Sequence, residues 1–405
     1  MPSTLPQGDP APLDGALPAQ LAPRLGARPF GIYLHVPYCA TRCGYCDFNT
    51  YTAAELGGTA SQASYARDAI TEIGLARRVL GDADLPVATV FFGGGTPTLL
   101  PTTDLAAMLR AIADNFGLQP GAEITIEANP ESVDAAFLAR LRAAGFTRIS
   151  FGMQSVAPHV LAVLDRRHTP GAPQQRVAEA RAAGFEHVSL DLIYGAPGES
   201  DDDWRASLAA AIEAGPDHVS AYALIVEDGT RLAARIRRGE LPMPDDDVLA
   251  DRYLIADELL SSAAFGWYEV SNWARPGGEC RHNLGYWRGD DWWGVGPGAH
   301  SHIGDLRWWN VKHPSAYASR LAAGSSPAQA RELLDDETRR FEDVMLRLRL
   351  SEGLDTAVLD DVGRKAAELE ADDGLLDASA LARGRAVLTL RGRLLADGVV
   401  RRLFG

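Results

Sequence analysis

Three cysteines stand within eight residues, in the spacing Cys39-x3-Cys43-x2-Cys46, directly after the apolar run Ile32–Val36. A tight thiol cluster of this kind is typical of metal binding, whereas a disulfide framework spreads its cysteines along the chain. Zinc usually takes four ligands in two pairs, and no second pair follows nearby. A [4Fe–4S] cluster also prefers four thiolates, so three thiolates would leave one iron open to another ligand. The alternatives are three core cysteines or an incomplete zinc site.

A second set of chemically capable residues stands where apolar, β-rich runs end. The run that closes at Phe92 continues as Gly93-Gly94-Gly95-Thr96-Pro97, and glycines at a strand end let the backbone approach a ligand closely. Glu127 and Gln154 end later runs, and Asp191 lies within another. An ordinary turn is the alternative for the glycines, and an arginine-paired strand-end acid is the alternative for Glu127. A structural salt bridge competes for Asp191, because an acid in an apolar strand is costly unless it is paired.

These residues need elements that bring them together, and from Pro29 to about Val311 short β-rich runs alternate with helical stretches. The expected strands are Ile32–Val36, Ala88–Phe92, Glu123–Ala128, Arg148–Gly152, His187–Tyr194 and His218–Ile225. Helices are expected at 61–80, 104–116, 133–144, 172–184 and 201–214. This alternation implies a parallel sheet of βαβ units, and six units indicate a complete or open barrel. In a barrel, active groups lie at the carboxyl ends of the strands.

The chain divides into four predicted regions. Residues 1–28 carry six prolines among alanines and are interpreted as a flexible extension without catalytic content. The barrel region spans 29–313, and the Gly-Ser-Ser-Pro sequence at Gly324–Pro327 marks a linker over 314–334. Residues 335–405 are expected to form a small winged-helix-like domain. Its many acids favour a packing or partner role over DNA binding.

Composition narrows the function classes. Of the 405 residues, 46% are hydrophobic and 23% charged, which is globular composition and excludes a collagenous or wholly disordered protein. The 54 acidic and 39 basic residues give a net charge of −15, whereas nucleic acid or anionic lipid would attract the opposite sign. The apolar runs are shorter than the ~18 residues of a membrane span. The N-terminus lacks the regions of a secretory signal, so a cytoplasmic location is expected.

The cysteine loop resembles that of the radical S-adenosylmethionine (SAM) superfamily, in which SAM completes the open iron of a [4Fe–4S] cluster. The resemblance implies a partial (β/α)6, TIM-like barrel in an α/β fold, with Cys39, Cys43 and Cys46 as cluster ligands. In such proteins the cofactor carries the chemistry, while the protein positions and shields it. The residues that would bind SAM by this resemblance are Tyr33, Gly94, Gly95, Thr96, Glu127, Gln154, Arg166, Asp191 and Ala223.

From about Pro29 to the C-terminus, the sequence is similar to the oxygen-independent coproporphyrinogen III oxidase group of that superfamily. Those oxidases carry a further cysteine two positions after the third cluster cysteine, where this chain has Phe48. The chain also contains Cys280-Arg-His282-Asn283-Leu-Gly-Tyr286-Trp287, which matches the His-Asn-x-x-Tyr-Trp motif of HemW-type heme chaperones. The resemblance therefore favours a heme chaperone over an oxidase that decarboxylates two propionates of coproporphyrinogen III. It implies heme, heme-acceptor proteins, a reductant protein and a homodimer as partners.

The motif also suits heme on chemical grounds, with His282, Asn283, Tyr286 and Trp287 as the expected contacts. Imidazole is a common axial ligand of heme iron, and in a helix His282 and Tyr286 would share a face. Trp287 offers an apolar wall, and seven of the eight tryptophans lie between Trp267 and Trp309. Aromatic clusters are, however, also common in protein cores.

Other heme ligands stay open as alternatives. Cys280 could supply a thiolate or a covalent attachment point, although a buried free thiol is at least as common. His300 and His302, which follow a glycine-rich turn, are alternative iron ligands.

Overall fold

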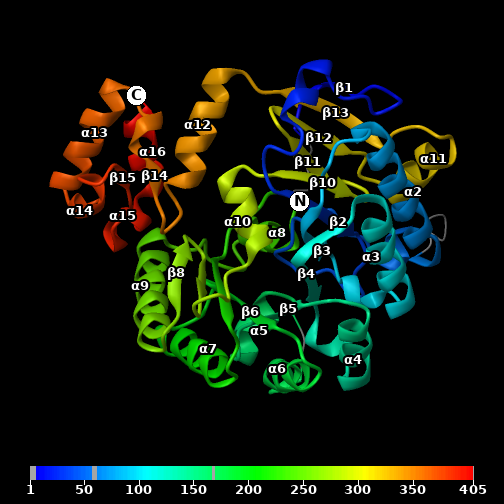
Figure 1. Cartoon of the computed structure of the whole chain (residues 1–405). Helices are drawn as coiled ribbons and strands as arrows, with labels where there is room; N and C mark the ends of the chain where they lie inside the picture. Colours follow the sequence, from blue (N-terminus) through cyan, green and yellow to red (C-terminus); the bar gives the residue numbers. More distant parts are fainter. Residues whose placement is uncertain (1–5, 57–61, 167–168, 405) are drawn as a thin grey trace.

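The computed structural model of the chain describes residues 6–56, 62–166 and 169–404, and a row of six parallel strands forms its centre (Figure 1). The strands are β2 (Phe30–Val36), β3 (Val87–Gly94), β4 (Leu118–Ala128), β5 (Arg148–Gln154), β6 (His187–Tyr194) and β7 (His218–Ala223). Each strand pairs in parallel with the next along the chain. The prediction of an α/β barrel of strand–helix units is confirmed, and the linear strand order makes the barrel partial.

Helices cover the outer side of this sheet (Figure 1). They are α2 (Gln62–Leu80), α3 (Thr102–Phe116), α4 (Ala135–Ala143), α6 (Ala172–Ala182) and α7 (Asp201–Glu213). The short helix α5 (Pro158–Val163) instead packs near the carboxyl ends of the strands, where Val160 joins a cluster with Ile193 and Leu224. All seven residues of β2 are buried, because a parallel strand is covered on both faces. Helix α2 buries one stripe against the sheet, with Tyr65, Ile73 and Leu80 each at most 3% exposed. The first residue of the predicted helix 61–80 lies outside the described residues.

The sheet continues beyond the barrel on both sides. Strand β10 (Asp291–Val295) pairs in parallel with β2, and β11 (His300–Ile303), β12 (Leu306–Asn310) and β13 (Ala328–Leu333) follow in antiparallel order. At the other edge, β9 (Asn272–Ala274) pairs with β7, and β8 (Gly266–Glu269) pairs with β9. The prediction of a linker over 314–334 is wrong. Helix α11 (Pro314–Ala322) packs there, and β13 hydrogen-bonds to β12, since a strand satisfies its backbone groups by pairing.

The interpretation of residues 1–28 as a flexible extension also needs correction. Residues 1–5 lie outside the described residues, but Asp9–Pro10 forms β1, which pairs with β13. The side chain of Leu21, in a short 3-10 helix (Ala19–Arg24), is buried in the main hydrophobic core. This stretch covers the free edge of β13 and adds apolar surface to the core, which accounts for its order despite its prolines.

The last part of the chain forms a separate helical module beside the barrel (Figure 1). Its elements are α12 (Asp336–Arg347), α13 (Asp361–Asp372), α14 (Ala378–Leu381), α15 (Leu390–Leu394), α16 (Ala396–Phe404) and the strand pair β14 (Leu354–Asp355) and β15 (Arg385–Ala386). The module has its own buried cluster, which includes Val344 and Val399. Its kinship to winged helices stays a prediction.

The helical module is fixed to the barrel side by an enclosed ion pair. Arg393 donates to both carboxylate oxygens of Asp257 at 2.8 and 3.0 Å, and Asp257 lies in α9 (Asp246–Ser262). The same guanidinium lies 4.4 Å from the ring centre of Trp267, in β8. No helix in the described part of the chain has the length and apolar character that crossing a bilayer requires.

Candidate functional site

One cavity of about 1360 Å³ inside the barrel collects nearly all the predicted site residues. Single-ligand pockets commonly hold ~300–1000 Å³, so this cavity has room for more than one ligand. The predicted residues that line it are Tyr33, Cys39, Cys43, Cys46, Gly94, Gly95, Thr96, Glu127, Gln154, Arg166, Asp191, Ala223, His282, Asn283 and Tyr286. Trp287 is not among the lining residues, so the structure does not bring this tryptophan to the cavity.

The three clustered cysteines lie on the loop that leaves β2 at its carboxyl end. A turn closes between Cys43 and Cys46, whose amide donates to the Cys43 carbonyl at 3.3 Å. The end of β3 lies directly against this loop. A Cβ atom at Gly95 would press into the carbonyl of Tyr38 and come within 3.0 Å of the Cys39 sulfur. Glycine is required at this position because the two backbones touch.

The three thiols are partly enclosed, and for two of them burial favours the protonated form. Burial raises the pKa of Cys46 to about 11 and also raises the pKa of Cys39. The guanidinium of Arg166 donates to the Cys43 sulfur at 3.4 Å and to the Gly152 carbonyl at 3.1 Å. A cation beside the loop favours thiolate, which is the form that binds iron.

Among residues 6–56, 62–166 and 169–404, no three Cys, His, Asp or Glu side chains are grouped to hold a single metal ion. The zinc alternative therefore gains no support from the described part of the chain. An iron–sulfur cube asks for a different arrangement, because each thiolate binds its own iron and the sulfurs surround a space. Cys39, Cys43 and Cys46 line one cavity, and three thiolates would leave one iron of such a cube open.

Gln154 ends β5 in an unusual backbone conformation. Its φ is +63°, in the left-handed region that residues other than glycine rarely adopt. A Cβ atom at Gly152 would lie 2.6 Å from the Gln154 amide nitrogen and 2.8 Å from Arg166 Nη2. Backbone strain of this kind concentrates at ligand sites, where the surrounding structure over-determines it. Arg166 Nε is also enclosed without a partner among the described residues.

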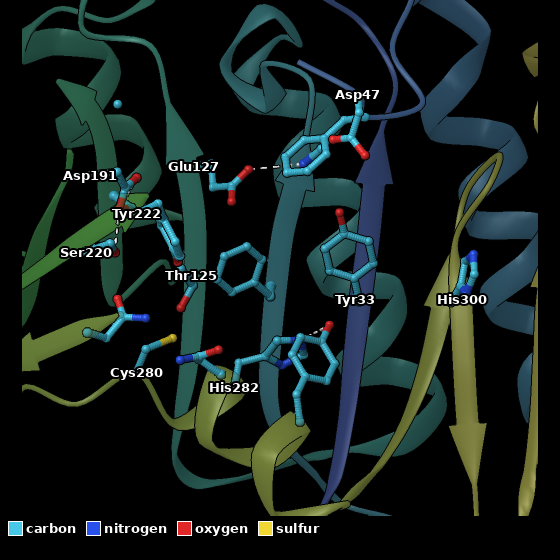
Figure 2. Close-up of a pocket in the computed structure, with 18 of the residues that line it drawn as sticks. Tyr33, Asp47, Thr125, Glu127, Asp191, Ser220, Tyr222, Cys280, His282 and His300 are labelled. Atoms are coloured by element: carbon cyan, nitrogen blue, oxygen red, sulfur yellow. Dashed lines mark hydrogen bonds between the residues drawn. The ribbon is translucent and has the colours of Figure 1, made fainter. Parts of the chain in front are cut away.

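The carboxylates of Glu127 and Asp191 face the same cavity (Figure 2). Glu127 accepts a hydrogen bond from the Gly94 amide at 3.1 Å, and burial followed by the charge of Asp191 raises its pKa to about 7. Asp191 accepts from the hydroxyls of Ser150 and Ser220 at 2.8 Å each, and burial raises its pKa. Within the described residues neither carboxylate forms an ion pair, so the predicted alternatives of arginine-paired acids find no support.

The predicted heme motif lies at the opposite end of the barrel from the cysteine loop. In Figure 2, Asp47 of that loop and His282 stand at opposite ends of the cavity. The motif forms α10 (Arg281–Arg288), and the His282 amide donates to Glu123, near the start of the barrel-facing part of β4, at 3.0 Å. The amino ends of barrel strands are commonly stabilising rather than catalytic. Helix α10 therefore closes the floor of the barrel.

Both ring nitrogens of His282 have partners in this floor. Nδ1 lies 2.8 Å from the Thr89 hydroxyl and Nε2 lies 2.9 Å from the Tyr286 hydroxyl. The ring stacks on Phe91, with 5.2 Å between ring centres, and burial lowers the His282 pKa to about 3. The predicted sharing of a helix face by His282 and Tyr286 agrees with this contact. The neighbouring Asn283 donates to Glu269 at 3.1 Å.

Sequence reasoning missed the buried pair beneath α10. Arg148 and Glu123 lie 3.7 Å apart with side chains 1% and 3% exposed, and Arg148 also donates to the Gly278 carbonyl at 2.9 Å. Cys280 lies 3.6 Å from the Glu123 carboxylate, and burial raises its pKa to about 12. Cys280 is thus a buried, protonated thiol. This favours the prediction of a buried free thiol over a thiolate ligand or a covalent attachment point. Both charged residues are the first residues of predicted strands. A charged residue at the start of an apolar run was the sequence feature that could have indicated this buried pair.

Comparison with known proteins agrees with this geometry. Residues 33–211 match the model of the Radical SAM superfamily. The coproporphyrinogen III oxidase (HemN) of Escherichia coli, described as a radical SAM enzyme, superposes with a TM-score of 0.80. That match is 24% identical and covers 95% of this chain and 92% of the oxidase, which establishes a shared fold. Fold and cysteine loop together define a radical SAM protein.

Sequence relatives then distinguish the heme chaperones from the oxidases within this superfamily. A heme chaperone HemW from Mycobacterium tuberculosis (strain ATCC 25618 / H37Rv) is 58% identical, over 95% of this chain and 97% of the relative. The heme chaperone HemW of Escherichia coli (strain K12) is 34% identical, over 80% of this chain and 83% of the relative. The chain belongs to the HemW heme chaperone family.

Proposed function

We propose that this chain is a heme chaperone that carries a [4Fe–4S] cluster and SAM in its barrel and delivers heme to acceptor proteins. One observation carries the proposal. Three clustered thiols, a strained glutamine and two carboxylates without an ion pair among the described residues line one cavity. Membership of the HemW family supports the heme half. Heme is cargo in this proposal, whereas the cluster and SAM are resident cofactors.

Cys39, Cys43 and Cys46 would hold the cluster by three thiolates. When bound, the cluster supplies a one-electron donor next to an open iron position for SAM. Residues of the chain shape the cluster site beside the cysteine loop. The glycine contact at Gly95 leaves space beside Cys39, and Arg166 holds a positive charge against Cys43.

The proposed SAM contacts surround the loop from several strands. Tyr33 contributes from β2, Gly94 and Gly95 from the end of β3 with Thr96 just after it, and Ala223 from β7. Glu127, Gln154, Arg166 and Asp191 would accept or donate hydrogen bonds to the polar atoms of SAM. Thr125 Oγ1 and Arg166 Nε lie in this region without partners among the described residues, which favours a polar ligand.

Heme would occupy the part of the cavity bounded by α10 and by the sheet extension β10–β12. Tyr286 and Trp292 meet there in an edge-to-face contact with ring centres 4.7 Å apart, and both line the cavity. The motif residues His282, Asn283 and Tyr286 would then form the floor against which the porphyrin packs, and Trp287 would act from outside the cavity. Heme-acceptor proteins, a reductant protein and a second copy of the chain are the partners that this function implies, and a cytoplasmic location goes with it.

A heme-transfer assay tests this function. The chain is reconstituted anaerobically with iron and sulfide, loaded with heme, and mixed with an apo-form acceptor hemoprotein, with and without SAM. We expect a cluster absorption that Cys39→Ser removes, and a transfer of the heme absorption to the acceptor. Production of protoporphyrinogen from coproporphyrinogen III by the reconstituted chain would instead establish an oxidase. Phe48 stands where those oxidases carry a cysteine, and its 43% exposed ring offers no thiol there.

A further inference from the structure

A second imidazole lines the same cavity on the sheet extension, away from the barrel floor. His302 lies in β11, where Ser301 and Ile303 on either side of it point into the core. His302 stands opposite Trp292 in the register of β10 and β11, with 5.0 Å between ring centres. Because successive strand residues alternate between faces, His302 points to the cavity face. Both residues line the cavity.

Hydrogen bonding fixes the tautomer of His302. Its Nδ1 lies 3.2 Å from the backbone carbonyl of Asp290, and a carbonyl can only accept. Nδ1 therefore carries the proton, and the lone pair stays on Nε2, which bonds to no donor in the part of the chain that the structure describes. Burial lowers the pKa of His302, which keeps the ring neutral. Metal-binding imidazoles in proteins share this arrangement, because the second nitrogen is held by a carbonyl or carboxylate.

The other two candidate histidines do not combine a hydrogen-bonded Nδ1 with an unbonded Nε2 among the described residues. His282 already uses both nitrogens, toward Thr89 and Tyr286, so iron binding would break one of those bonds. His300 also lines the cavity, but its Nε2 is enclosed against the protein without a partner among the described residues, and its ring is tilted against Trp309 with 5.8 Å between ring centres. Of the three rings, His302 alone combines a held Nδ1 with an unbonded Nε2 among the described residues.

The surroundings of His302 suit a flat, apolar ligand with carboxylate groups. Trp292 provides an aromatic surface beside it, and Met345 and Leu346 of α12 line the cavity from the helical module. Arg28 also lines the cavity, and its charge contributes to lowering the His302 pKa, which places the guanidinium nearby. Its hydrogen bond is to the Gly289 carbonyl at 2.9 Å, and no carboxylate pairs with it among the described residues. A porphyrin carboxylate would supply that partner.

We propose that Nε2 of His302 is the axial ligand of the iron of bound heme. The proposal rests on the proposed heme-chaperone function. The lone pair of Nε2 forms the bond to ferric iron and displaces a weakly held water or chloride, and no electron changes hands. Heme then lies between β10–β12 and α12, so the motif helix α10 supports the site without binding iron.

Hemin titration of the anaerobically reconstituted chain tests this assignment, with the Soret band and the electron paramagnetic resonance spectrum as readouts. We expect His302→Ala to weaken hemin binding by at least about tenfold and to lose the imidazole-bound spectrum. Added imidazole should restore that spectrum, which shows that the variant is folded. His302→Tyr should give the charge-transfer absorption of a phenolate-bound ferric heme. The matched control is His159→Ala, because His159 is exposed on α5 and does not line the cavity.

The outcomes separate the inference from the function. An unchanged spectrum and affinity in His302→Ala, or the loss of the imidazole-bound spectrum in His282→Ala or His300→Ala alone, would overturn the assignment while heme binding stands. Absence of hemin binding to the unaltered chain would remove the proposed function, and the assignment with it. Loss in His302→Ala with recovery by imidazole supports both.

Discussion

The carboxylate of Glu127 should make SAM binding depend on pH near neutrality. Burial and the neighbouring charge of Asp191 raise the Glu127 pKa to about 7, against an ordinary value of 4.5, while the Gly94 amide is its one hydrogen-bond donor among the described residues. An ionised carboxylate accepts hydrogen bonds from SAM and attracts the positive sulfonium, whereas the protonated acid does so poorly. SAM should therefore bind the ionised form of the site.

The size of the effect follows from the ionised fraction. With a pKa of about 7, roughly 9% of Glu127 is ionised at pH 6 and roughly 91% at pH 8, and the apparent dissociation constant scales inversely with that fraction. We expect SAM to bind about tenfold more tightly at pH 8 than at pH 6. Glu127→Gln keeps the shape of the side chain but cannot ionise, so its affinity should be weaker and nearly independent of pH.

Equilibrium binding of labelled SAM to the cluster-loaded chain measures this at several pH values. The cluster absorption is recorded in each sample, because loss of iron at low pH would imitate the effect. The same pH dependence in Glu127→Gln would show that another group, such as Asp191, titrates instead. A flat profile in the unaltered chain would refute the reasoning altogether.

Three further results are expected. Cys39→Ser should abolish the cluster absorption while Cys280→Ser retains it, as measured by iron content and visible spectra, because Cys280 is a buried thiol beside Glu123. Arg393→Ala should lower the free energy of urea unfolding by about 3 kcal/mol, since it leaves the enclosed carboxylate of Asp257 unpaired; an unchanged midpoint would contradict that anchor. Burial raises the pKa of Glu72 to about 7, so the folded chain holds a proton that the unfolded chain releases above its ordinary pKa of 4.5. Stability should then fall by up to ~1.4 kcal/mol per pH unit between these values, and Glu72→Gln should lose that slope in thermal melts.

Much of the fold could be predicted from the pattern of residues along the sequence. The six predicted strands match β2–β7 to within a few residues, because apolar runs between helical stretches are a property of the sequence itself. The cysteine loop and the glycine-rich end of β3 were found for the same reason, since neighbours in sequence stay neighbours in space. Residues at the carboxyl ends of parallel strands meet at one end of a barrel, so Glu127 and Gln154 could be placed together before the structure was known.

Long-range pairing could not be predicted in the same way. The stretch 314–334 resembled a linker, because one short strand and a short helix carry too few periodic residues to identify them. The proline-rich start of the chain gave no sign that it would cover β13. Both elements owe their place to partners far away in sequence.

For the site, the sequence determined which chemistry is present, and the tertiary structure decided which groups are free to perform it. The motif spacing placed the Tyr286 hydroxyl one helical turn from His282, but only the fold brought the Thr89 hydroxyl to the other ring nitrogen. Likewise, the sequence shows His302 as one histidine among nine, and the carbonyl of Asp290 leaves its Nε2 unbonded. Hydrogen bonds between distant segments set the protonation and orientation of a side chain, and those bonds exist only once the sheet has formed.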